Sequence, residues 1–306
     1  MTPKLTVLVI GSTGMLGIKI VSALLDKRAI QVKAMVRPNS YDKEDNRKKI
    51  DEIKAKGAII VEGDLMKPDT LLPVFEGVDV VVSAVGNNQV TVSGQKNAIA
   101  VAQKQGVKKF IPSDYTINYR ELDYGDNHNL DMRKEVFDYL QSTDLAYTSV
   151  LNGAFTEILL SPFLQIFDFD NSIFNYWGDG EIQFDTTTTD DTAKYVAEVV
   201  SDPETANTFV EVAGDVISMD KLLTTYEQTT GKALTKKRLG SIEDLKSWIE
   251  QKKQKADSPM EYLPQQYLYA MVSGKGKFNN IQNARYPKIE PLTTKQYLEQ
   301  VNVTPL

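Results

Sequence analysis

The sequence begins with an apolar run that leads directly into a glycine-rich turn. The segment VLVIGSTGMLG, residues 7–17, spaces Gly11, Gly14 and Gly17 as GxxGxxG. Gly11 stands where a strand ends and a tight turn needs backbone freedom, and Gly17 stands where a helix must pack closely on the sheet. An apolar strand, a glycine turn and an amphipathic helix in this order predict the first unit of a parallel α/β sheet.

The first 150 residues continue this alternation of strands and helices. The predicted strands are 5–10, 31–36, 58–61, 78–84, 108–112 and 146–151, and the predicted helices are 15–27, 42–56, 69–75, 92–105 and 129–142. Strands such as VDVVVSAV are almost entirely apolar, which suits a sheet buried on both faces and joined by right-handed βαβ connections. We therefore predict the α/β class, with a Rossmann-type doubly wound parallel sheet.

The pattern changes after Asn152. The following segment combines an apolar helix, a hairpin predicted around WGDGE and another helix, and further helices are predicted at 218–230, 241–256 and 259–273. We predict a Rossmann-type domain over 1–152 and a smaller α/β substrate lobe over 153–306, packed on the first domain and able to return strands to its sheet. A cleft between two such parts is the usual place for a ligand.

The composition excludes several classes of function. The chain has 306 residues, no cysteine, one histidine and a net charge of −6. Without cysteine there is no disulfide, no thiolate zinc site and no cysteine nucleophile, and we predict no metal site. The negative charge argues against binding to a nucleic-acid backbone. Because the sequence has no apolar stretch of about 20 residues and no signal-peptide core, we expect a cytoplasmic protein with no membrane segment.

The glycine turn also fits a pyrophosphate. Gly14 lets a phosphate approach the main chain, and the helix that begins there directs free N–H groups and its positive dipole end at the turn. A turn that serves packing alone is the weaker interpretation, because the motif lies directly between an apolar strand and an amphipathic helix. The residues predicted to bind the cofactor here are Gly11, Ser12, Thr13, Gly14, Met15, Leu16 and Gly17, with Ser12 and Thr13 adding hydroxyl donors.

The end of the second predicted strand distinguishes between two dinucleotides. An NAD site usually has an acidic residue there, which binds the ribose hydroxyls, whereas this strand ends in Arg37. A guanidinium suits a 2′-phosphate, with which it makes charge-assisted hydrogen bonds. The position therefore favours NADP(H) over NAD(H), and a surface arginine with no role is the alternative.

Residues that follow the later strands complete the predicted cofactor site. Asp64 and Leu65, in EGDLMKP, come after the third strand, where the aspartate can accept from the exocyclic amine of adenine and the leucine can flank its ring. The carboxyl ends of parallel strands meet at one edge of the sheet, so residues beyond the later strands are expected beside the cofactor. These are Val85, Gly86, Asn87, Ser113, Asn152, Gly153 and Phe155, of which Phe155 is expected to contact the nicotinamide or the substrate.

Together these segments resemble the atypical short-chain dehydrogenases of the NmrA-like and isoflavone reductase-like type. The matching segments are GSTGMLG, VRP, EGDL and QKNAIAVAQKQGVKKFIPSDY, followed by LAYTSVLNGAF and GDGEIQFDTTTTDDTAKYVAEVVSDP. The resemblance implies NADPH binding and, for plant-type members, reduction of isoflavones, lignans or phenylpropanoid ethers. Other relatives reduce quinones, and some bind the cofactor without turnover, as redox sensors or transcriptional co-regulators.

The catalytic position of that family is altered here. The Tyr-x-x-x-Lys pattern of the wider dehydrogenase group is absent from the sequence, and the family lysine aligns with Arg133 in LDMRKEVFDYL. Arginine stays protonated and cannot be a general acid or base, although it can anchor the nicotinamide ribose or polarise a carbonyl. Lys134 would take the lysine role only if the helix register shifted by one residue, because neighbouring helix positions differ by about 100°.

Two other residues are candidates for the catalytic site. His128 is the only histidine, and it is the first substitute for the missing acid because its ordinary pKa lies near neutrality; a structural role is its alternative. Tyr115, with Asp114 and Asn118, follows the fifth strand and is expected to line the pocket, with packing over the sheet edge as an equal alternative.

Three functions remain after these observations. The favoured one is an NADPH-dependent reductase that transfers a hydride to a small aromatic, quinone-like, enone or ether acceptor. The second is an NADP(H)-binding redox sensor without catalysis, which alone among the three requires a protein partner. A sugar-nucleotide epimerase is disfavoured because the Tyr-x-x-x-Lys pair is missing.

Overall fold

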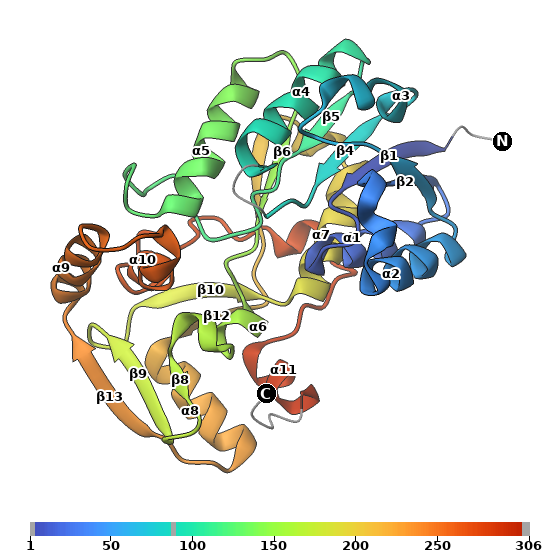
Figure 1. Ribbon diagram of the computed structural model, residues 1–306. Coiled ribbons are helices and arrows are strands. Elements are labelled where there is room, and N and C mark those ends of the chain that lie inside the picture. The colour runs from blue at the N-terminus through green and yellow to red at the C-terminus, as the bar shows by residue number, and fades with distance from the viewer. Residues whose placement is uncertain (1–3, 87–89, 302–306) are drawn as a thin grey trace. The chain divides into compact units, whose positions relative to one another are not determined.

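The computed structural model describes residues 4–86 and 90–301. The chain forms two compact units, shown in Figure 1. The first unit holds the chain up to Asp114 together with Met132–Val150 and Thr192–Val210, and the second holds Tyr115–Asp131, Leu151–Asp191 and the chain from Glu211 onward. Each unit is therefore assembled from separate stretches of sequence.

A parallel sheet of five strands, in the order β3-β2-β1-β4-β5, forms the centre of the first unit. The strands are β1 (Leu5–Ile10), β2 (Ile30–Val36), β3 (Ile59–Glu62), β4 (Val80–Ser83) and β5 (Lys109–Ile111). Val9 of β1 lies opposite Ala34 on one side and Val82 on the other. Because the strand order reverses at β1, the sheet is doubly wound. The predicted fold class is confirmed.

Helices cover both faces of this sheet. Figure 1 shows α1 (Met15–Leu25) and α2 (Glu44–Ala55) on one face, and α3 (Leu72–Phe75), α4 (Gln95–Lys104) and α5 (His128–Gln141) on the other. Leu8 and Phe110 of the sheet pack against Val136 and Leu140 of α5, and all four are fully buried. Short 3₁₀ and π segments lie at Pro38–Asp42, Pro68–Thr70, Val90–Gly94 and Pro203–Thr205.

One more strand pair and a helix complete the first unit. β6 (Thr148–Leu151) pairs with β11 (Thr208–Glu211), and α7 (Thr189–Ser201) precedes β11. The buried ammonium of Lys109 donates to the carbonyl oxygens of Val199 (3.0 Å) and Asp202 (2.7 Å), at the C-terminal end of α7. A cation at this end of a helix is favoured by the helix dipole. Burial lowers the pKa of Lys109, and the nearby Asp202 offsets part of this effect.

The second unit contains two small sheets, in the orders β12-β10-β7 and β13-β9-β8. Their strands are β7 (Ala154–Phe155), β8 (Phe167–Asp168), β9 (Ile173–Trp177), β10 (Gln183–Thr187), β12 (Asp215–Ser218) and β13 (Thr235–Gly240). The helices are α6 (Thr156–Leu159), α8 (Met219–Thr230), α9 (Ile242–Lys253), α10 (Leu263–Val272) and α11 (Thr294–Gln300), with 3₁₀ turns at Pro162–Leu164, Pro259–Glu261 and Asn283–Arg285. The predicted helices near 218–230, 241–256 and 259–273 are confirmed as α8, α9 and α10.

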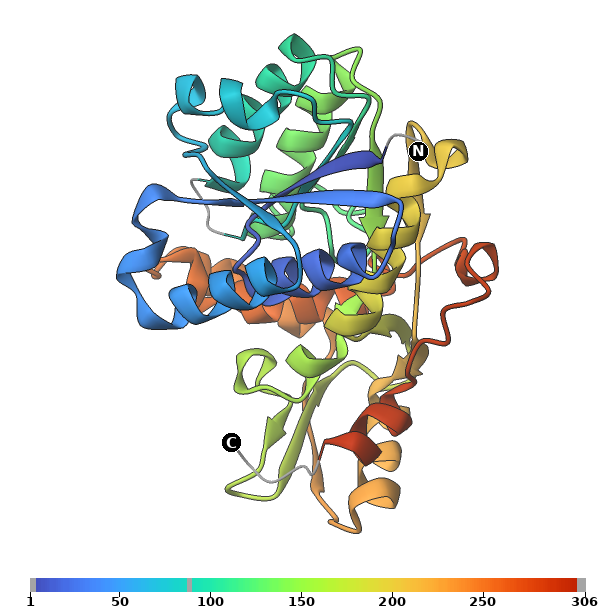
Figure 2. The same cartoon turned by 90° about the vertical axis from the view of Figure 1, so that its right-hand side faces the viewer.

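Aromatic side chains form the core of the second unit. The ring of Phe167 packs edge-on against Phe174 at 5.1 Å between centroids, and it packs at a tilt against Tyr226 of α8 at 5.2 Å. Figure 2 shows α8, in orange, beside α11, in red. Because Phe174 and Tyr226 are buried, these rings fix β8 and β9 on α8.

The predicted hairpin around WGDGE is wrong. β9 pairs with β8 and β13, whereas β10 pairs with β7 and β12, so the two strands belong to different sheets. The glycine turn does reverse the chain, since Gly178 and Gly180 have φ of +76° and +87°. However, the amide of Gly178 donates to Gly240, and the carbonyl of Gly180 accepts from Asp220. The two glycines thus bond to Gly240 and Asp220, outside the turn, and not across a hairpin between β9 and β10.

Two buried carboxylates accept hydrogen bonds from residues 277–280, the segment that follows α10. Asp185 accepts from the ammonium of Lys277 and from the amide of Phe278 (2.7 Å). Glu211 accepts from Arg120 and from the amides of Asn279 (3.1 Å) and Asn280 (2.8 Å). Burial raises the pKa of Asp185 even though Lys277 opposes the shift. The segment is therefore tied to β10 and β11 by charge-assisted hydrogen bonds.

Among residues 4–86 and 90–301, no helix is long and apolar enough to cross a membrane.

Candidate functional site

The glycine turn between β1 and α1 is shaped by two close backbone contacts. Gly11 has φ of +78°, and a side chain there would collide with the carbonyl of Ala84. A Cβ on Gly17 would collide with the carbonyl oxygen of Gly11. The amide of Gly14 donates to that same carbonyl at 2.9 Å. Only glycine fits at Gly11 and Gly17, which is the arrangement that the spacing predicts.

The N-terminus of α1 opens at this turn. Gly14 is the N-cap and provides no side-chain hydrogen bond, so the amides of the first helical turn keep their donors for a ligand. Met15 is exposed, Thr13 is half-buried and Leu16 is buried. The hydroxyl of Ser12, expected to face a phosphate, is buried and donates to the carbonyl of Met35 at 2.8 Å. That bond anchors the turn to β2.

Arg37 lies directly beyond β2, in the first unit. Its side chain is exposed, and its main chain is fixed by two bonds with Ser40: the Arg37 amide donates to the Ser40 hydroxyl (3.1 Å), and the Ser40 amide donates to the Arg37 carbonyl (2.9 Å). A fixed backbone with an exposed guanidinium is suitable for binding a phosphate.

The two residues predicted at the adenine have different environments. One carboxylate oxygen of Asp64 accepts from the amide of Met66 at 3.0 Å, which closes the turn after β3. Leu65 is 5% exposed and belongs to the hydrophobic core, and its carbonyl accepts from Asn97 at 2.8 Å. The leucine thus packs into the first unit, while the aspartate is half-buried.

A buried glutamine organises the carboxyl end of the sheet, and sequence reasoning missed it. The amide oxygen of Gln95 accepts from the backbone of Ser113 (2.9 Å), and its nitrogen donates to Thr91 (2.8 Å). The Ser113 hydroxyl donates to the carbonyl of Val85 at 2.7 Å. The loops after β4 and β5 are therefore tied together. Gly86 is exposed beside Val85, and Asn87 lies outside the described residues.

Helix α5 carries the two basic candidates. Arg133 and Lys134 are both half-buried, whereas Val136 and Leu140 are fully buried. At 3.6 residues per turn, Arg133 lies on the same face as Val136 and Leu140, and Lys134 lies about 100° away. The helix geometry therefore associates Arg133, rather than Lys134, with the packed face of α5.

The remaining catalytic candidates lie in the second unit. Asn127 caps α5 through hydrogen bonds from the amides of Asn129 and Leu130, and His128 is the first helical residue. The amide of His128 donates to Gln266 at 3.0 Å, and its side chain is half-buried. Tyr115 is 5% exposed.

The residues after β6 form a buried turn in the second unit. Gly153 has φ of +72°, and a side chain there would collide with Asp185. Asn152 is fully buried, and its main chain bonds to Thr116 and Thr187. Neither polar atom of its side chain has a hydrogen-bond partner among the described residues. Phe155 is half-buried and precedes α6. A buried amide without partners is typical of a ligand contact.

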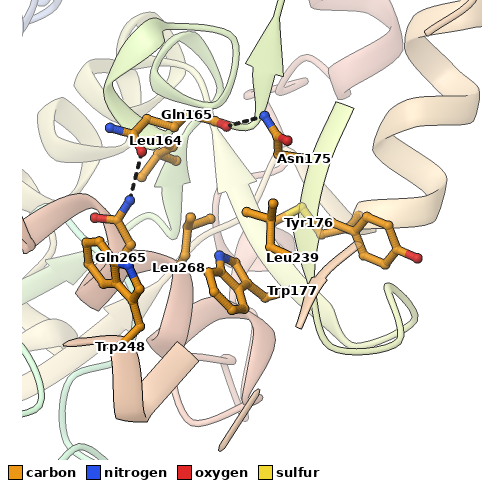
Figure 3. Close-up of a pocket in the computed structure, with 10 residues that line it drawn as sticks. Leu164, Gln165, Asn175, Tyr176, Trp177, Leu239, Trp248, Gln265 and Leu268 are labelled. Atoms are coloured by element: carbon orange, nitrogen blue, oxygen red, sulfur yellow. Dashed lines mark hydrogen bonds between the residues drawn. The ribbon is translucent and has the colours of Figure 1, made fainter. Parts of the chain in front are cut away.

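A pocket within the second unit was also missed by sequence reasoning, because its residues are far apart in the chain. Figure 3 shows this pocket, whose volume is about 370 Å³. Both tryptophans of the chain line it. The lining residues are Leu164, Gln165, Asn175, Tyr176, Trp177, Met219, Leu239, Trp248, Gln265 and Leu268. The sequence carries one signal of it, the high aromatic content of residues 163–177.

Within the described parts of the chain, no group of three or more histidine, aspartate or glutamate side chains is arranged to hold a metal ion.

Comparison with known proteins gives the family. The model of the NmrA-like family matches residues 3–301, nearly the whole chain. The chain is a member of the NmrA-like family. The predicted resemblance is thereby confirmed.

Relatives of this NmrA-like protein include plant reductases. It is 28% identical to pinoresinol reductase 1 of Arabidopsis thaliana over 263 residues, which is 82% of each chain. It is 27% identical to the phenylcoumaran benzylic ether reductase Pyrc5 of Pyrus communis over 322 residues, covering 98% and 99% of the two chains. The solved structure of AtPrR2 with NADP⁺ and (+)pinoresinol matches with a TM-score of 0.86 at 24% identity, over 98% of this chain and 99% of that one. The fold is thus shared along the whole chain.

Proposed function

We propose that this NmrA-like protein is an NADPH-dependent reductase that transfers a hydride to a small aromatic, quinone-like, enone or ether acceptor. The observation that carries the proposal is the open N-terminus of α1 at a turn where only glycine fits, followed by Arg37 beyond the neighbouring strand. Anions bind at such helix ends because of the free amides and the helix dipole. The names of its relatives, which include pinoresinol and benzylic ether reductases, support an aromatic acceptor.

The chain supplies binding groups for each part of the cofactor. The amides at Gly14–Gly17 hold the pyrophosphate, and Arg37 holds the 2′-phosphate. Asn152 and Phe155 are proposed contacts for the nicotinamide end, which agrees with the unpartnered amide of Asn152. NADPH supplies a hydride when bound, so the protein must orient it and stabilise the charge that develops on the acceptor.

Arg133 has a restricted role in this reaction. Its guanidinium stays charged, so it can donate hydrogen bonds to a ribose or to an acceptor oxygen but cannot deliver a proton. Acceptors that need only charge stabilisation, such as quinones, should therefore react faster than ethers, whose leaving oxygen must be protonated. His128 and Lys134 are the alternative proton donors.

The experiment compares wild type with Arg133→Lys and Lys134→Arg on a quinone, an enone and a benzylic ether, following the loss of NADPH absorbance. We expect Arg133→Lys to raise ether turnover by about tenfold or more, the range of a positioned general acid, and to change quinone turnover little. Lys134→Arg is the matched comparison: it should leave both rates unchanged when Arg133 holds the family lysine position, whereas a loss of ether turnover would assign the proton donor to Lys134. No turnover of any acceptor by wild type or Arg133→Lys, despite NADPH binding, would refute the reductase.

One observation favours a second function. An arginine in place of the family lysine is compatible with a protein that binds NADP(H) without catalysis. A sensor must discriminate between NADP⁺ and NADPH, because a ligand shifts a conformational equilibrium only by its differential affinity. Calorimetric titration of both forms tests this, and equal affinities together with turnover of an acceptor would exclude the sensor.

A further inference from the structure

The first turn of α4 is connected to the loops that follow three strands of the parallel sheet. Gln95, the first residue of α4, is fully buried, and its side-chain oxygen accepts from the backbone amide of Ser113, beyond β5, at 2.9 Å. The Ser113 hydroxyl donates to the carbonyl of Val85, beyond β4, at 2.7 Å. Asn97, two residues further along the helix, donates to the carbonyl of Leu65, beyond β3, at 2.8 Å. One helical turn thus fixes the carboxyl ends of β3, β4 and β5.

Both ends of the Gln95 side-chain amide are used. Its nitrogen donates to the carbonyl of Thr91 at 2.8 Å, in the π-helical segment Val90–Gly94 that precedes α4. Short π-helical segments are frequent at functional sites. The packing here is close, since a Cβ on Gly94 would lie 3.0 Å from the Cβ of Leu65. An apolar side chain in place of Gln95 would leave two buried backbone groups without their partner, which is unfavourable.

The loop after β4 also packs against the glycine turn. The carbonyl of Ala84 lies where a Cβ on Gly11 would stand, and the Ala84 amide donates to the carbonyl of Ile10 at 2.9 Å. β1 and β4 are neighbours at the point where the strand order of the sheet reverses. Ligands of doubly wound sheets bind at this point, beyond the carboxyl ends of the strands. The loop that Gln95 fixes through Ser113 therefore lies beside the turn proposed for the pyrophosphate.

The strand order divides the proposed cofactor site into two sides. Arg37, proposed for the 2′-phosphate, follows β2, and Leu65 follows β3, so the proposed function places the adenosine half of the cofactor on this side of β1. The nicotinamide half then lies on the other side, over the loops after β4 and β5. Asn97 is bonded to the adenosine side and Gln95 to the nicotinamide side.

We propose that Gln95 is a positioning residue, which holds the loops after β4 and β5 in the arrangement that receives the nicotinamide half of the cofactor. It acts through Ser113 and Val85, whereas Asn97 acts through Leu65 on the adenosine half. The inference rests on the proposed function, because it takes Arg37 and the glycine turn as the site of the adenosine half. It adds that the two halves are controlled by different residues of one helical turn.

The test compares two ligands by isothermal titration calorimetry: NADP⁺ and 2′,5′-ADP, which has the adenosine half and its 2′-phosphate but no nicotinamide. Gln95→Met keeps the length of the side chain and removes both hydrogen bonds. It should weaken NADP⁺ binding by about tenfold or more and change 2′,5′-ADP binding by less than about twofold. A role in stability alone would lower the folded fraction and weaken both ligands by the same factor. An unchanged ratio of the two affinities would therefore overturn the proposal.

Asn97→Ala is the matched control from the same helical turn. It removes the hydrogen bond to Leu65, so it should weaken NADP⁺ and 2′,5′-ADP by the same factor, of about threefold or more, and leave their ratio unchanged. A selective loss of NADP⁺ binding in Asn97→Ala, like that expected for Gln95→Met, would contradict the separate control of the two halves.

Ser113→Ala is the milder variant, and it decides the question if Gln95→Met fails to fold by circular dichroism. It keeps the amide bond to Gln95 and removes only the bond to Val85, so it should weaken NADP⁺ binding selectively, by about threefold or more. An unchanged ratio in Ser113→Ala would again overturn the proposal. Wild-type protein that binds neither ligand would refute the proposed function itself, whereas wild type that binds both, with an unchanged ratio in the variants, would refute the positioning role alone.

Discussion

The glycine turn of the first unit and the aromatic pocket of the second are built in different ways. The turn is made of backbone, and a Cβ at Gly11 or Gly17 would strike a carbonyl. The pocket is made of side chains from strands β9 and β13 and helices α9 and α10, and several of them are exposed. A backbone site leaves a short motif in the sequence, whereas a side-chain pocket does not. The turn should also tolerate far less substitution than the pocket.

Gly17→Ala should have the largest effect. Because the new Cβ would meet the Gly11 carbonyl, and neither backbone can move without breaking β1 or α1, we expect a loss of about 4 kcal/mol or more in stability and no measurable NADPH binding. Circular dichroism during urea unfolding and a fluorescence titration with NADPH measure both. Gly86→Ala is the control for stability, since a Cβ there has no atom within 4 Å. Near wild-type stability of Gly17→Ala would show that the turn is not fixed as described.

Phe174→Ala and Trp248→Ala separate the core of the second unit from its pocket. Phe174 is fully buried against Phe167, so its truncation should cost about 3–4 kcal/mol. Trp248 is 38% exposed, so Trp248→Ala should cost only about 1 kcal/mol. Urea unfolding gives both values. Similar losses of unfolding free energy for the two variants would mean that Trp248 packs as part of the core.

Arg37→Glu should weaken NADPH binding by roughly 100-fold, because it replaces a charge-assisted hydrogen bond to the 2′-phosphate with repulsion. NADH binding should be unchanged, since NADH lacks that phosphate. Arg28→Glu is the matched control: Arg28 is also exposed but precedes β2 instead of following it. Calorimetric titration with each nucleotide is the measurement, and equal losses for NADPH and NADH would contradict the assignment of Arg37.

The smallest expected effect is a difference in pH dependence between the two units. Burial alone would raise the pKa of Asp79, but hydrogen bonds from Lys108 and from the amide of Thr6 lower it overall. Its contribution to stability is therefore present above the ordinary aspartate pKa of about 3.9 and is lost as pH falls through its folded value. Burial raises the pKa of Asp185, so its contribution is full below about 3.9 and is lost as pH rises through its folded value.

Asp79→Asn and Asp185→Asn test these signs. The difference in unfolding free energy between wild type and Asp79→Asn should grow as pH rises from strongly acidic values. The difference for Asp185→Asn should change in the opposite direction, by of order 1 kcal/mol. Urea unfolding across the acidic range measures both. Slopes of the same sign would contradict the environments described for one of the two carboxylates.

Much of the first unit was predictable because local rules and tertiary packing agree there. The apolar strands, the alternating helices and the glycine spacing all indicate a doubly wound sheet, and the observed order β3-β2-β1-β4-β5 has that form. The strand pairing on either side of the turn after Trp177 was not predictable in this way. The glycines of the turn permit a reversal, but the choice of partner strands depends on β8 and β13, which lie elsewhere in the sequence.

The same distinction between local and tertiary properties applies to the candidate functional site. Motif and position predicted the turn, Arg37 and the helix of Arg133 as parts of the site. They missed Gln95, whose buried side chain connects Thr91 with Ser113. They also assigned Leu65 to the adenine ring, whereas the structure packs it in the core of the first unit. Burial and hydrogen-bond partners are tertiary properties, and no spacing rule encodes them.

The sequence by itself determined the class of fold, the family and a backbone turn suited to a phosphate, because these depend on glycine, apolar periodicity and charge at neighbouring positions. Only the tertiary structure decided which face of α5 carries Arg133, where the Ser12 hydroxyl donates, and that two distant tryptophans meet in one pocket. The physical reason is that a backbone conformation is specified locally, whereas a side-chain environment is specified by whichever segments pack around it.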